Sequence, residues 1–476
     1  MQKFTKIIAT VSDKRCEIDF IKSLSNAGVN VVRMNSAHLS YEGFKKIVHN
    51  TRMANPSLAI MMDTKGPEIR TTSTVDGEAL EIKTGDVVKV SGNPDGITSQ
   101  SEIFLSYRDI AKVLKKGDCI LIDDGELEFE IIEADGVNIL ARAANDGMLG
   151  ARKSVNLPGV TVDLSAVTER DRINIGYGVE LGVDFIAHSF VRSAADVMEV
   201  QGILDSLGSD AKIISKIENQ EGIDNIDEIL EVSYGIMVAR GDLGIEVSAE
   251  RLPGIQSMLI HKCITAHKPV IVATQMLHTM IDHLRPTRAE ISDVANAVYQ
   301  RVDAMMLSGE TAYGKYPLEA VGIMTSVAKE VEKGLKHKMD VPPLLDADIT
   351  SFLAHEAVMS ENKVGTKAIF TDAYRGVSAR FIASFRGSIP TFAICHNTSV
   401  QRWLALSYGV AAYLDSRTDD FVPGHSIEAV RQIVEDDHVA YTDRIAYLTG
   451  TRKGACALEI LTPAEILEAP VPDVKA

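Results

Sequence analysis

A lysine and two carboxylates with strand-like spacing are the residues of this chain best suited to chemistry. Lys216 and Glu218 lie at the end of an apolar run, and because side chains of a strand alternate between faces, these two point the same way. The next apolar run, residues 235–239, leads to Asp242 and places a second carboxylate at the end of a neighbouring strand. Two carboxylates and one lysine suit a magnesium site for phosphoryl transfer. By itself, the pair of Lys216 and Glu218 fits an ordinary ion pair equally well.

Eight short apolar runs predict the framework that positions these residues. Each run is typical of a buried parallel strand, and helix-like stretches follow most of them. Eight such units predict a (β/α)8 TIM barrel, in which the chemistry lies at the C-terminal ends of the strands. Polar residues collect at those ends here. The predicted strands cover residues 6–11, 29–35, 58–63, 184–189, 212–218, 235–241, 269–275 and 303–308.

The spacing of these units predicts two further domains. Residues 64–183 separate the third and fourth strands, and their short β-like runs alternate with Gly and Asp-Gly turns, which indicates an inserted small β-barrel domain. Such a domain suits a lid, since phosphoryl transfer requires that water be excluded. Val341-Pro342-Pro343 marks a linker to a C-terminal α/β domain that begins with a strand at 368–371, and its expected role is regulation or oligomerisation. The expected boundaries are 1–70 with 156–341 for the catalytic barrel, 71–155 for the lid and 342–476 for the C-terminal domain.

Composition and charge exclude several classes of function. The 476 residues carry a formal net charge of −17, which argues against a nucleic-acid-binding protein because such a protein needs a basic face. No apolar run reaches the roughly 18 residues of a membrane span, and the first residues lack the apolar region of a signal peptide. The five cysteines are scattered without metal-binding spacing, as in a reduced compartment. We therefore expect a cytoplasmic protein.

One phosphate-binding pattern is set aside. Residues 309–315 match most of a Walker A sequence, but Tyr316 stands where a hydroxyl should bind magnesium. The pattern also follows the eighth barrel strand and not a strand of a nucleotide-binding sheet. We interpret it as the closing loop of the barrel.

Several long strings resemble the pyruvate kinase family over nearly the whole chain. One of them is Asp-Thr-Lys-Gly-Pro-Glu-Ile-Arg at residues 63–70, and strings of that length are highly specific. The resemblance implies transfer of a phosphoryl group from phosphoenolpyruvate to ADP, which gives pyruvate and ATP in the final step of glycolysis. It also implies a homotetramer. The other strings cover residues 155–159, 215–219, 238–244, 273–277, 286–290 and 306–311.

The resemblance implies roles for the residues at the strand ends. Glu218 and Asp242 match ligands of a divalent ion, Mg²⁺ or Mn²⁺, and Lys216 matches the lysine that stabilises the phosphoryl group and the enolate. Thr274 matches the threonine linked to protonation of the enolate. The amides of Gly241 and Asp242 match the site of the substrate carboxylate, where a helix N-terminus favours an anion.

Further matches concern the phosphates. Arg33 matches an arginine that holds the transferring phosphate, and Ser189 matches a serine near the phosphoryl site. Arg70 and Lys153 match groups that bind the nucleotide phosphates, the lysine when the lid closes. The resemblance thus implies that Arg70 and Lys153 bind the phosphates of ADP.

Asn35, Asp63 and Thr64 match ligands of a monovalent cation, usually K⁺. Asn35 and His38 also border the expected nucleotide site, although an ordinary structural histidine fits His38 equally well. The family's serine ligand is replaced by Ala37, so we expect a weakened dependence on K⁺.

Two regions depart from the family or extend it. Residues 12–15 differ from the usual loop beside the nucleotide base, which leaves the base preference open. In the C-terminal domain, Thr371, Gly376, Ser378 and Arg380 resemble a loop that binds a phosphorylated allosteric effector, with about two extra residues. An ordinary strand-to-helix turn fits this segment equally well.

Two alternatives stay open at the level of sequence. A barrel lyase or aldolase could use the same metal ligands on a pyruvate enolate, but it would need no second phosphate set such as Arg70 and Lys153. A non-catalytic metabolite-binding protein is supported by Ala37 and the altered loop at 12–15. Metal-dependent turnover separates the binding protein from both enzymes, and dependence on ADP separates the kinase from the lyase.

Overall fold

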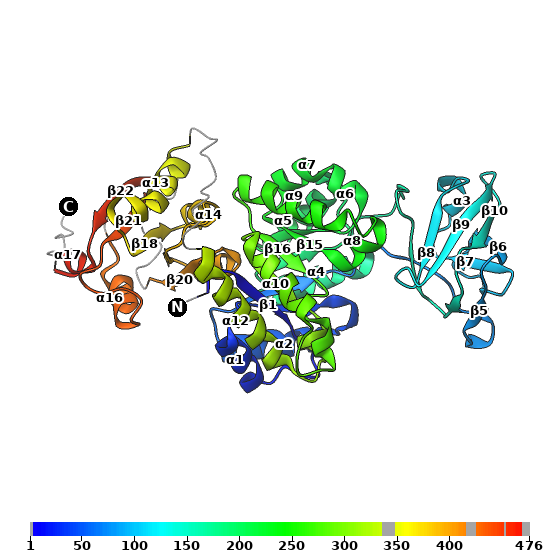
Figure 1. The fold of residues 1–476 in the computed structure, drawn as a ribbon, viewed down its shortest axis with the longest axis horizontal. Coiled ribbons are helices and arrows are strands. Elements are labelled where there is room, and N and C mark those ends of the chain that lie inside the picture. The colour runs from blue at the N-terminus through cyan, green and yellow to red at the C-terminus, as the bar shows by residue number, and fades with distance from the viewer. Residues whose placement is uncertain (1–2, 336–347, 416–424, 452–453, 469–476) are drawn as a thin grey trace.

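The structure, a computed structural model, describes residues 3–335, 348–415, 425–451 and 454–468. It places three units in a row, with the barrel between the C-terminal unit and the β-rich insert (Figure 1). The active-site candidates lie in the central unit and at its junction with the insert.

The central unit is a closed barrel of eight parallel strands in the order β1-β17-β16-β15-β14-β13-β3-β2, which confirms the predicted TIM barrel. Each predicted run contains one observed strand. The sixth strand ends at Ala239, earlier than predicted, because Arg240, Gly241 and Asp242 form the first turn of a short helix, α8 (Arg240–Glu246). The strands are β1 (Lys6–Thr10), β2 (Val31–Asn35), β3 (Ala59–Asp63), β13 (Phe185–His188), β14 (Lys212–Ile217), β15 (Gly235–Ala239), β16 (Val270–Ala273) and β17 (Ala304–Leu307).

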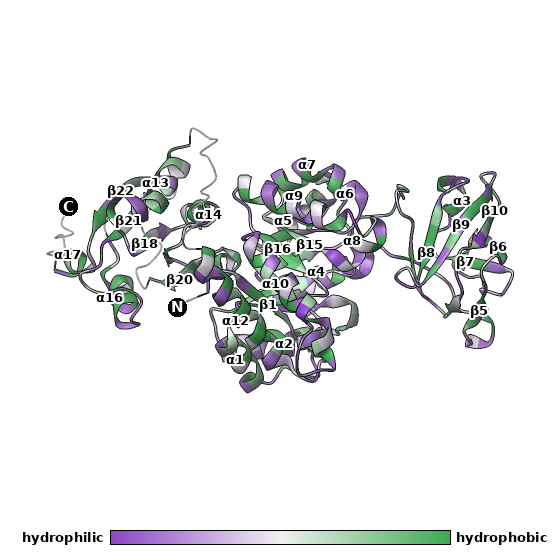
Figure 2. Cartoon of the chain, in the orientation of Figure 1, coloured by the Kyte–Doolittle hydropathy of each residue, from purple (hydrophilic) through white to green (hydrophobic). Residues whose placement is uncertain are grey.

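Helices surround these strands and pack against the buried apolar side chains on their outer faces. Figure 2 colours each residue of these elements by its hydropathy. Local sequence sets where several helices begin. The best example is the capping box of Thr287 and Glu290 before α10, in which each side chain accepts from the other residue's backbone amide. The main surrounding helices are α1 (Ile18–Ala27), α2 (Tyr41–Ala54), α4 (Glu169–Leu181), α5 (Ala194–Ser206), α7 (Ile226–Val232), α9 (Leu252–Thr265), α10 (Arg288–Tyr299) and α12 (Pro317–Leu335).

The β insert, defined here as strands β4 to β12, forms a near-closed barrel with its own apolar core. Its main sheet has the order β4-β12-β8-β9-β10-β6-β7, and a bridge between Thr71 and Leu105 brings its two edges together. Alternating burial along β9 fits a sheet with one apolar face. The strands are β4 (Ile69–Arg70), β5 (Leu80–Ile82), β6 (Val87–Gly92), β7 (Glu102–Leu105), β8 (Cys119–Ile122), β9 (Leu127–Ala134), β10 (Ile139–Ala143), β11 (Gly147–Leu149) and β12 (Ser154–Asn156).

The C-terminal unit is a mixed five-stranded sheet in the order β20-β19-β18-β21-β22, with only β22 antiparallel. The first strand extends to Ala373, two residues beyond the predicted end at 371. The elements are α13 (Ile349–Val364), β18 (Ala368–Ala373), α14 (Val377–Ser384), β19 (Thr391–Cys395), α15 (Thr398–Trp403), β20 (Val410–Leu414), α16 (Ile427–Glu435), β21 (Ile445–Thr451), β22 (Gly454–Leu461) and α17 (Pro463–Glu468).

A buried ion pair joins this unit to the N-terminal end of the barrel. Arg386 Nη1 lies 3.0 Å from Asp303 Oδ1, and both side chains are at most 4% exposed. The backbone amides of Tyr408 and Val270 also donate to Asp303, at 2.9 and 3.1 Å. Because the junction lies just before β17, it is at the opposite end of the barrel from the strand ends that carry the chemistry.

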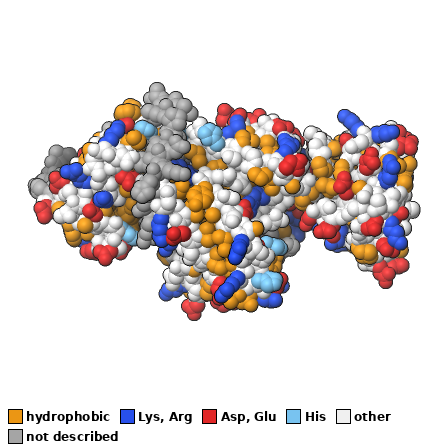
Figure 3. All heavy atoms as spheres, in the orientation of Figure 1, with side chains coloured by type: hydrophobic (Ala, Val, Ile, Leu, Met, Phe, Trp, Pro, Cys, Tyr) orange, Lys and Arg blue, Asp and Glu red, His pale blue; other side chains and the backbone are white. Residues whose placement is uncertain are grey.

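On the face shown in Figure 3, acidic and basic side chains are interspersed. No helix among the described residues is long and apolar enough to cross a membrane.

Candidate active site

Lys216 is the centre of a buried polar cluster at the C-terminal ends of β3, β13 and β14. Its Nζ lies 3.1 Å from Asp63 Oδ1 and 3.0 Å from Glu218 Oε1, and it donates to Ser189 Oγ at 2.7 Å. The sequence placed Lys216 and Glu218 on one face of a strand, and the structure brings them together. Burial opposes the charge of Lys216, but the carboxylates of Asp63 and Glu218 raise its pKa, so the ammonium form is retained.

Asp63 joins Lys216 to Arg33. Arg33 Nε lies 2.6 Å from Asp63 Oδ2, and Arg33 Nη1 donates to Thr10 Oγ1 at 3.0 Å. Burial opposes ionisation of Asp63, but the positive charges of Arg33 and Lys216 hold the pKa of its carboxyl below the usual range. The two cations are therefore held beside one ionised carboxylate.

Glu218 is buried and only partly satisfied. Its Oε2 accepts from the backbone amide of Phe190 at 2.7 Å, whereas Oε1 has no aligned hydrogen bond within the described parts of the chain, although it lies near Lys216. Burial raises the pKa of Glu218 to about 7, and the nearby charge of Asp242 contributes to the rise. Burial likewise raises the pKa of Asp242.

These two carboxylates fit a divalent cation. A partly unsatisfied buried oxygen and two neighbouring carboxylates with raised pKa values both favour an added positive charge. The described residues hold no group of three or more His, Cys, Asp or Glu side chains arranged for a metal. Glu218 and Asp242 would therefore supply only part of a coordination shell, which suits Mg²⁺ because that ion usually keeps several water or substrate oxygens.

Thr274 lies beside the first turn of α8. Its Oγ1 accepts from the Gly241 amide at 2.7 Å and donates to Ala273 O at 2.6 Å. Thr274 and Gln275 both have positive φ angles, 68° and 54°, which is unusual for a β-branched residue such as threonine. The structure thus brings Thr274 and Gly241 together and fixes the hydroxyl in a strained loop.

The expected monovalent-cation ligands lie at neighbouring strand ends, since Asn35 and Asp63 are partners in the register of β2 and β3. The Asn35 side chain accepts from the Ala37 amide at 3.1 Å and caps the turn Ser36–His38. Thr64 O accepts from Ser189 Oγ at 2.7 Å. The side chain of His38 lies outside the described part of the structure.

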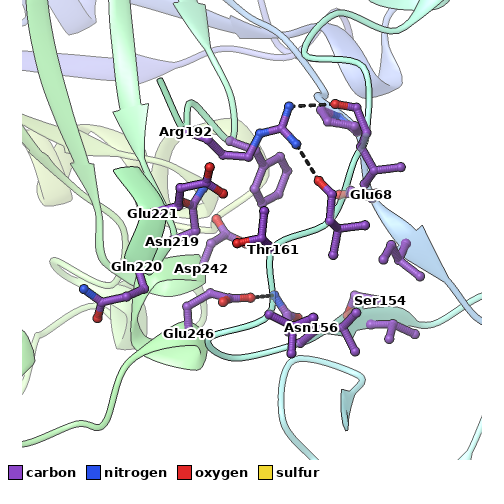
Figure 4. A pocket seen from close by; sticks show the side chains of 18 of the residues that line it. Glu68, Ser154, Asn156, Thr161, Arg192, Asn219, Gln220, Glu221, Asp242 and Glu246 are labelled. Atoms are coloured by element: carbon purple, nitrogen blue, oxygen red, sulfur yellow. Dashed lines mark hydrogen bonds between the residues drawn. The ribbon is translucent and has the colours of Figure 1, made fainter. Parts of the chain in front are cut away.

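Arg70 and Lys153 lie at the base of the insert. Arg70 Nη2 is 2.6 Å from Glu68 Oε2, and Lys153 Nζ is 2.6 Å from Asp123 Oδ2. Both residues line a cavity of about 610 Å³ between the insert and the barrel, and Asp242 lines the same cavity (Figure 4). The predicted nucleotide set and a predicted metal ligand therefore share one space, while Lys216 is not among the lining residues.

Three polar residues of this junction were not identified from the sequence as site residues. Arg192 donates to the carbonyl oxygens of Val162 and Leu164 at 2.8 and 2.6 Å and so holds the chain that returns from the insert. Asn156 Nδ2 donates to Glu246 Oε1 at 3.1 Å across the junction (Figure 4). The sequence offered little indication of these three residues, because they differ from ordinary polar surface residues only in their contacts with segments far away in the chain.

The effector residues proposed from the sequence are only partly assembled. Thr371 is buried inside β18, two residues before its end, and its hydroxyl donates to the carbonyl oxygen of Asp372 at 3.3 Å. Arg380 lies over the ring of Tyr234 at 5.0 Å. Gly376, with φ 74°, and the buried Ser378 do lie at the start of α14. The strand extends further than expected because its parallel pairing with β19 continues to Ala373.

Comparison with known proteins agrees with this geometry. The family described as "Pyruvate kinase, barrel domain" matches residues 2–321, and "Pyruvate kinase, alpha/beta domain" matches residues 352–459. A pyruvate kinase of Borreliella burgdorferi is 44% identical over 98% of this chain and 99% of its own length. One from Clostridium perfringens is 39% identical over 94% of this chain and 96% of its own length.

A solved structure shows the same fold. The crystal structure of a pyruvate kinase from Cryptosporidium parvum superposes with a TM-score of 0.91 at 34% identity, and it covers 97% of this chain and 96% of its own. A TIM barrel with this strand-end cluster and these matches defines a phosphotransferase. The chain belongs to the pyruvate kinase family. Its activity is the conversion of phosphoenolpyruvate to pyruvate with formation of ATP, a reaction of glycolysis.

Proposed function

We propose that the Lys216 cluster is the phosphoryl-transfer centre of this enzyme. The observation that carries the proposal is the contact of Lys216 Nζ with Asp63, Ser189 and Glu218 at the strand ends. A buried ammonium aimed at a phosphoryl group stabilises the charge that develops during transfer, and it then stabilises the enolate oxygen. Arg33, held by Asp63, supplies a second cation for the same phosphate.

The divalent ion in this proposal is Mg²⁺ or Mn²⁺, held by Glu218 and Asp242. A divalent ion held there would supply positive charge against the negative charge of the substrate. The protein orients these two ligands itself, because the Phe190 amide fixes one oxygen of Glu218 and leaves the other available. The amides of Gly241 and Asp242 at the start of α8 bind the substrate carboxylate, and the Gly241 amide is then shared with the Thr274 hydroxyl to which it donates in this structure. Thr274 directs a proton to the enolate carbon through water.

ADP binds on the side of the insert in this proposal. Arg70 and Lys153 line the cavity shared with Asp242, so their cations suit phosphates that lie next to the divalent ion. Closure of the insert, with proposed bounds 71–155, would shorten the distance from Lys153 to the Lys216 cluster and exclude water. The ion pairs of Lys153 with Asp123 and of Arg70 with Glu68 would exchange for phosphate contacts.

The remaining parts of the proposal concern ions and assembly. Asn35, Asp63 and Thr64 bind K⁺, with one ligand fewer because residue 37 is alanine. We infer a cytoplasmic homotetramer from the family. A phosphorylated effector binds at Gly376 and Ser378 in this proposal. For Thr371 and Arg380 to bind it as well, the Thr371 hydroxyl would have to leave the Asp372 carbonyl and Arg380 would have to leave the Tyr234 ring.

The deciding experiment measures pyruvate formation from phosphoenolpyruvate with Mg²⁺, with and without ADP, for the wild type and Lys216→Met. We expect turnover that requires ADP and falls by about 10³- to 10⁵-fold in the variant, since a preorganised cation is lost. Lys112→Met is the matched control, because Lys112 is exposed on the insert and forms an ion pair with Asp109, away from the cluster. Turnover without ADP would favour the lyase, and Lys216→Met with normal turnover would refute the assigned centre.

A further inference from the structure

Arg240 connects helix α10 to the loop that carries Thr274. Its Nη1 donates to Asp293 Oδ1 at 2.7 Å, and its Nη2 donates to Thr274 O at 2.8 Å. The side chain of Arg240 is 10% exposed, and its Nε has no hydrogen-bond partner among the described residues. The buried guanidinium is thus held by Asp293 at one end and, through Nη2, by the Thr274 carbonyl and by Met276 Sδ at 2.9 Å.

The Thr274 carbonyl needs such a partner because its backbone is strained. Two consecutive residues with positive φ, Thr274 and Gln275, are in a strained backbone conformation, which persists only when the surroundings hold it. The Thr274 hydroxyl is already held by the Gly241 amide and the Ala273 carbonyl. Arg240 holds the carbonyl, so hydroxyl and carbonyl are both fixed by neighbours from the start of α8.

We propose that Asp293 is a positioning residue for the proton-transfer half of the reaction, acting on Thr274 through Arg240. Asp293 lies on α10, outside the barrel strands, and its side chain is 34% exposed. Its carboxylate fixes the guanidinium, the guanidinium fixes the Thr274 carbonyl, and the hydroxyl of Thr274 keeps its direction. Loss of the carboxylate therefore affects protonation of the enolate at C3 more than binding of ADP, which takes place on the insert side.

This inference rests on the proposed function of Thr274, and its test includes measurements that do not need the complete reaction. The variants are Asp293→Asn, which removes the charge at constant size, and Asp293→Glu, which keeps it. Asp282→Asn is the control, because Asp282 is an exposed aspartate that pairs with Lys315. The measurements are kcat and KM, exchange of the pyruvate methyl hydrogens in D₂O with Mg²⁺ and inorganic phosphate, and crystal structures.

We expect Asp293→Asn to lower kcat and methyl-hydrogen exchange by about 10- to 100-fold, as for a small displacement of a catalytic group. The KM for ADP should stay within about threefold, since no ADP contact changes. Asp293→Glu should recover part of the loss, and Asp282→Asn should behave like the wild type. In the crystal structure of Asp293→Asn, the Arg240 guanidinium should leave the Thr274 carbonyl, and Thr274 should leave the positive-φ region.

Two results would overturn the inference. One is a crystal structure of Asp293→Asn in which Arg240 and Thr274 are unchanged. The other is a loss of activity shared by the Asp282→Asn control or confined to the KM for ADP. If the wild type itself failed to turn over phosphoenolpyruvate with ADP, the proposed function would fail, but the crystal structures would still decide whether Asp293 positions Thr274.

Discussion

Arg33 and Lys216 are held on opposite oxygens of one carboxylate, because Arg33 Nε lies 2.6 Å from Asp63 Oδ2 and Lys216 Nζ lies 3.1 Å from Asp63 Oδ1. The spacing of the two cations is thus set by a residue that the sequence suggested only as a K⁺ ligand. We expect Asp63 to be as important for positioning the phosphate cations as for binding K⁺.

Asp63→Asn should impair both catalysis and stability. The change leaves two buried cations without their shared anion, which typically costs about 3–5 kcal/mol of folding free energy, and we expect kcat to fall by at least about 100-fold. Urea unfolding and steady-state kinetics measure the two effects. Asp282→Asn serves as an exposed control. A near-normal kcat for Asp63→Asn would contradict the proposal that Asp63 positions Arg33 and Lys216.

Glu218→Gln and Asp242→Asn should weaken binding of a divalent cation. Each removes one of the two carboxylates that face the site, so we expect the affinity for Mn²⁺ to fall by at least about 100-fold. Titration of Mn²⁺ followed by electron paramagnetic resonance measures binding without turnover. Glu246→Gln is a suitable control, because Glu246 lines the same cavity but bonds to Asn156. Equal affinity in all three variants would place the ion elsewhere.

Ala37→Ser should strengthen activation by K⁺. The added hydroxyl would stand in the turn capped by Asn35, where the family carries a serine ligand. One additional ligand worth about 1.4 kcal/mol would lower the K⁺ concentration for half activation by about tenfold. The measurement is initial rate against K⁺ at constant ionic strength, with Na⁺ as the replacement ion. An unchanged K⁺ requirement would mean that residue 37 does not contact the ion.

His188 should make stability depend on pH in the acidic range. Burial lowers the pKa of His188 to about 4, whereas an unfolded histidine titrates near 6.5. The unfolded state therefore binds the proton first, so this contribution is intact above pH 6.5 and is lost as pH falls towards 4, by about 3 kcal/mol in all. In His188→Phe, the unfolding free energy should fall less over this window. Parallel pH profiles for both proteins would show that His188 does not titrate as expected.

The sequence predicted the parts of the site that depend on local spacing. Period-2 alternation at Lys216 and Glu218 and the parallel-strand pattern were enough to bring these residues to one end of a barrel. Asp293 and Glu246 could not be identified in this way, because their importance comes from single contacts between segments far apart in the chain.

The strand before the proposed effector loop is longer than predicted. The run at 368–371 predicted a strand end at Thr371, whereas parallel pairing with β19 extends β18 to Ala373 and leaves Thr371 inside the sheet. Strand ends are poorly specified by local sequence, since the last residues are decided by which neighbours cover them. The early end of β15 at Ala239 has the same origin, because the start of α8 takes over the backbone there.

The two outer units differ in how separable they are from the barrel. The insert has its own core, and besides its two chain connections it contacts the barrel through the hydrogen bond from Asn156 to Glu246. The C-terminal unit supplies Arg386, the partner of a buried aspartate at the start of β17. Deleting it would remove the Arg386 guanidinium and the Tyr408 amide from Asp303, while the Val270 amide of the barrel would remain as a donor. The barrel and the C-terminal unit therefore share a buried ion pair at their junction, whereas the apolar core of the insert is its own.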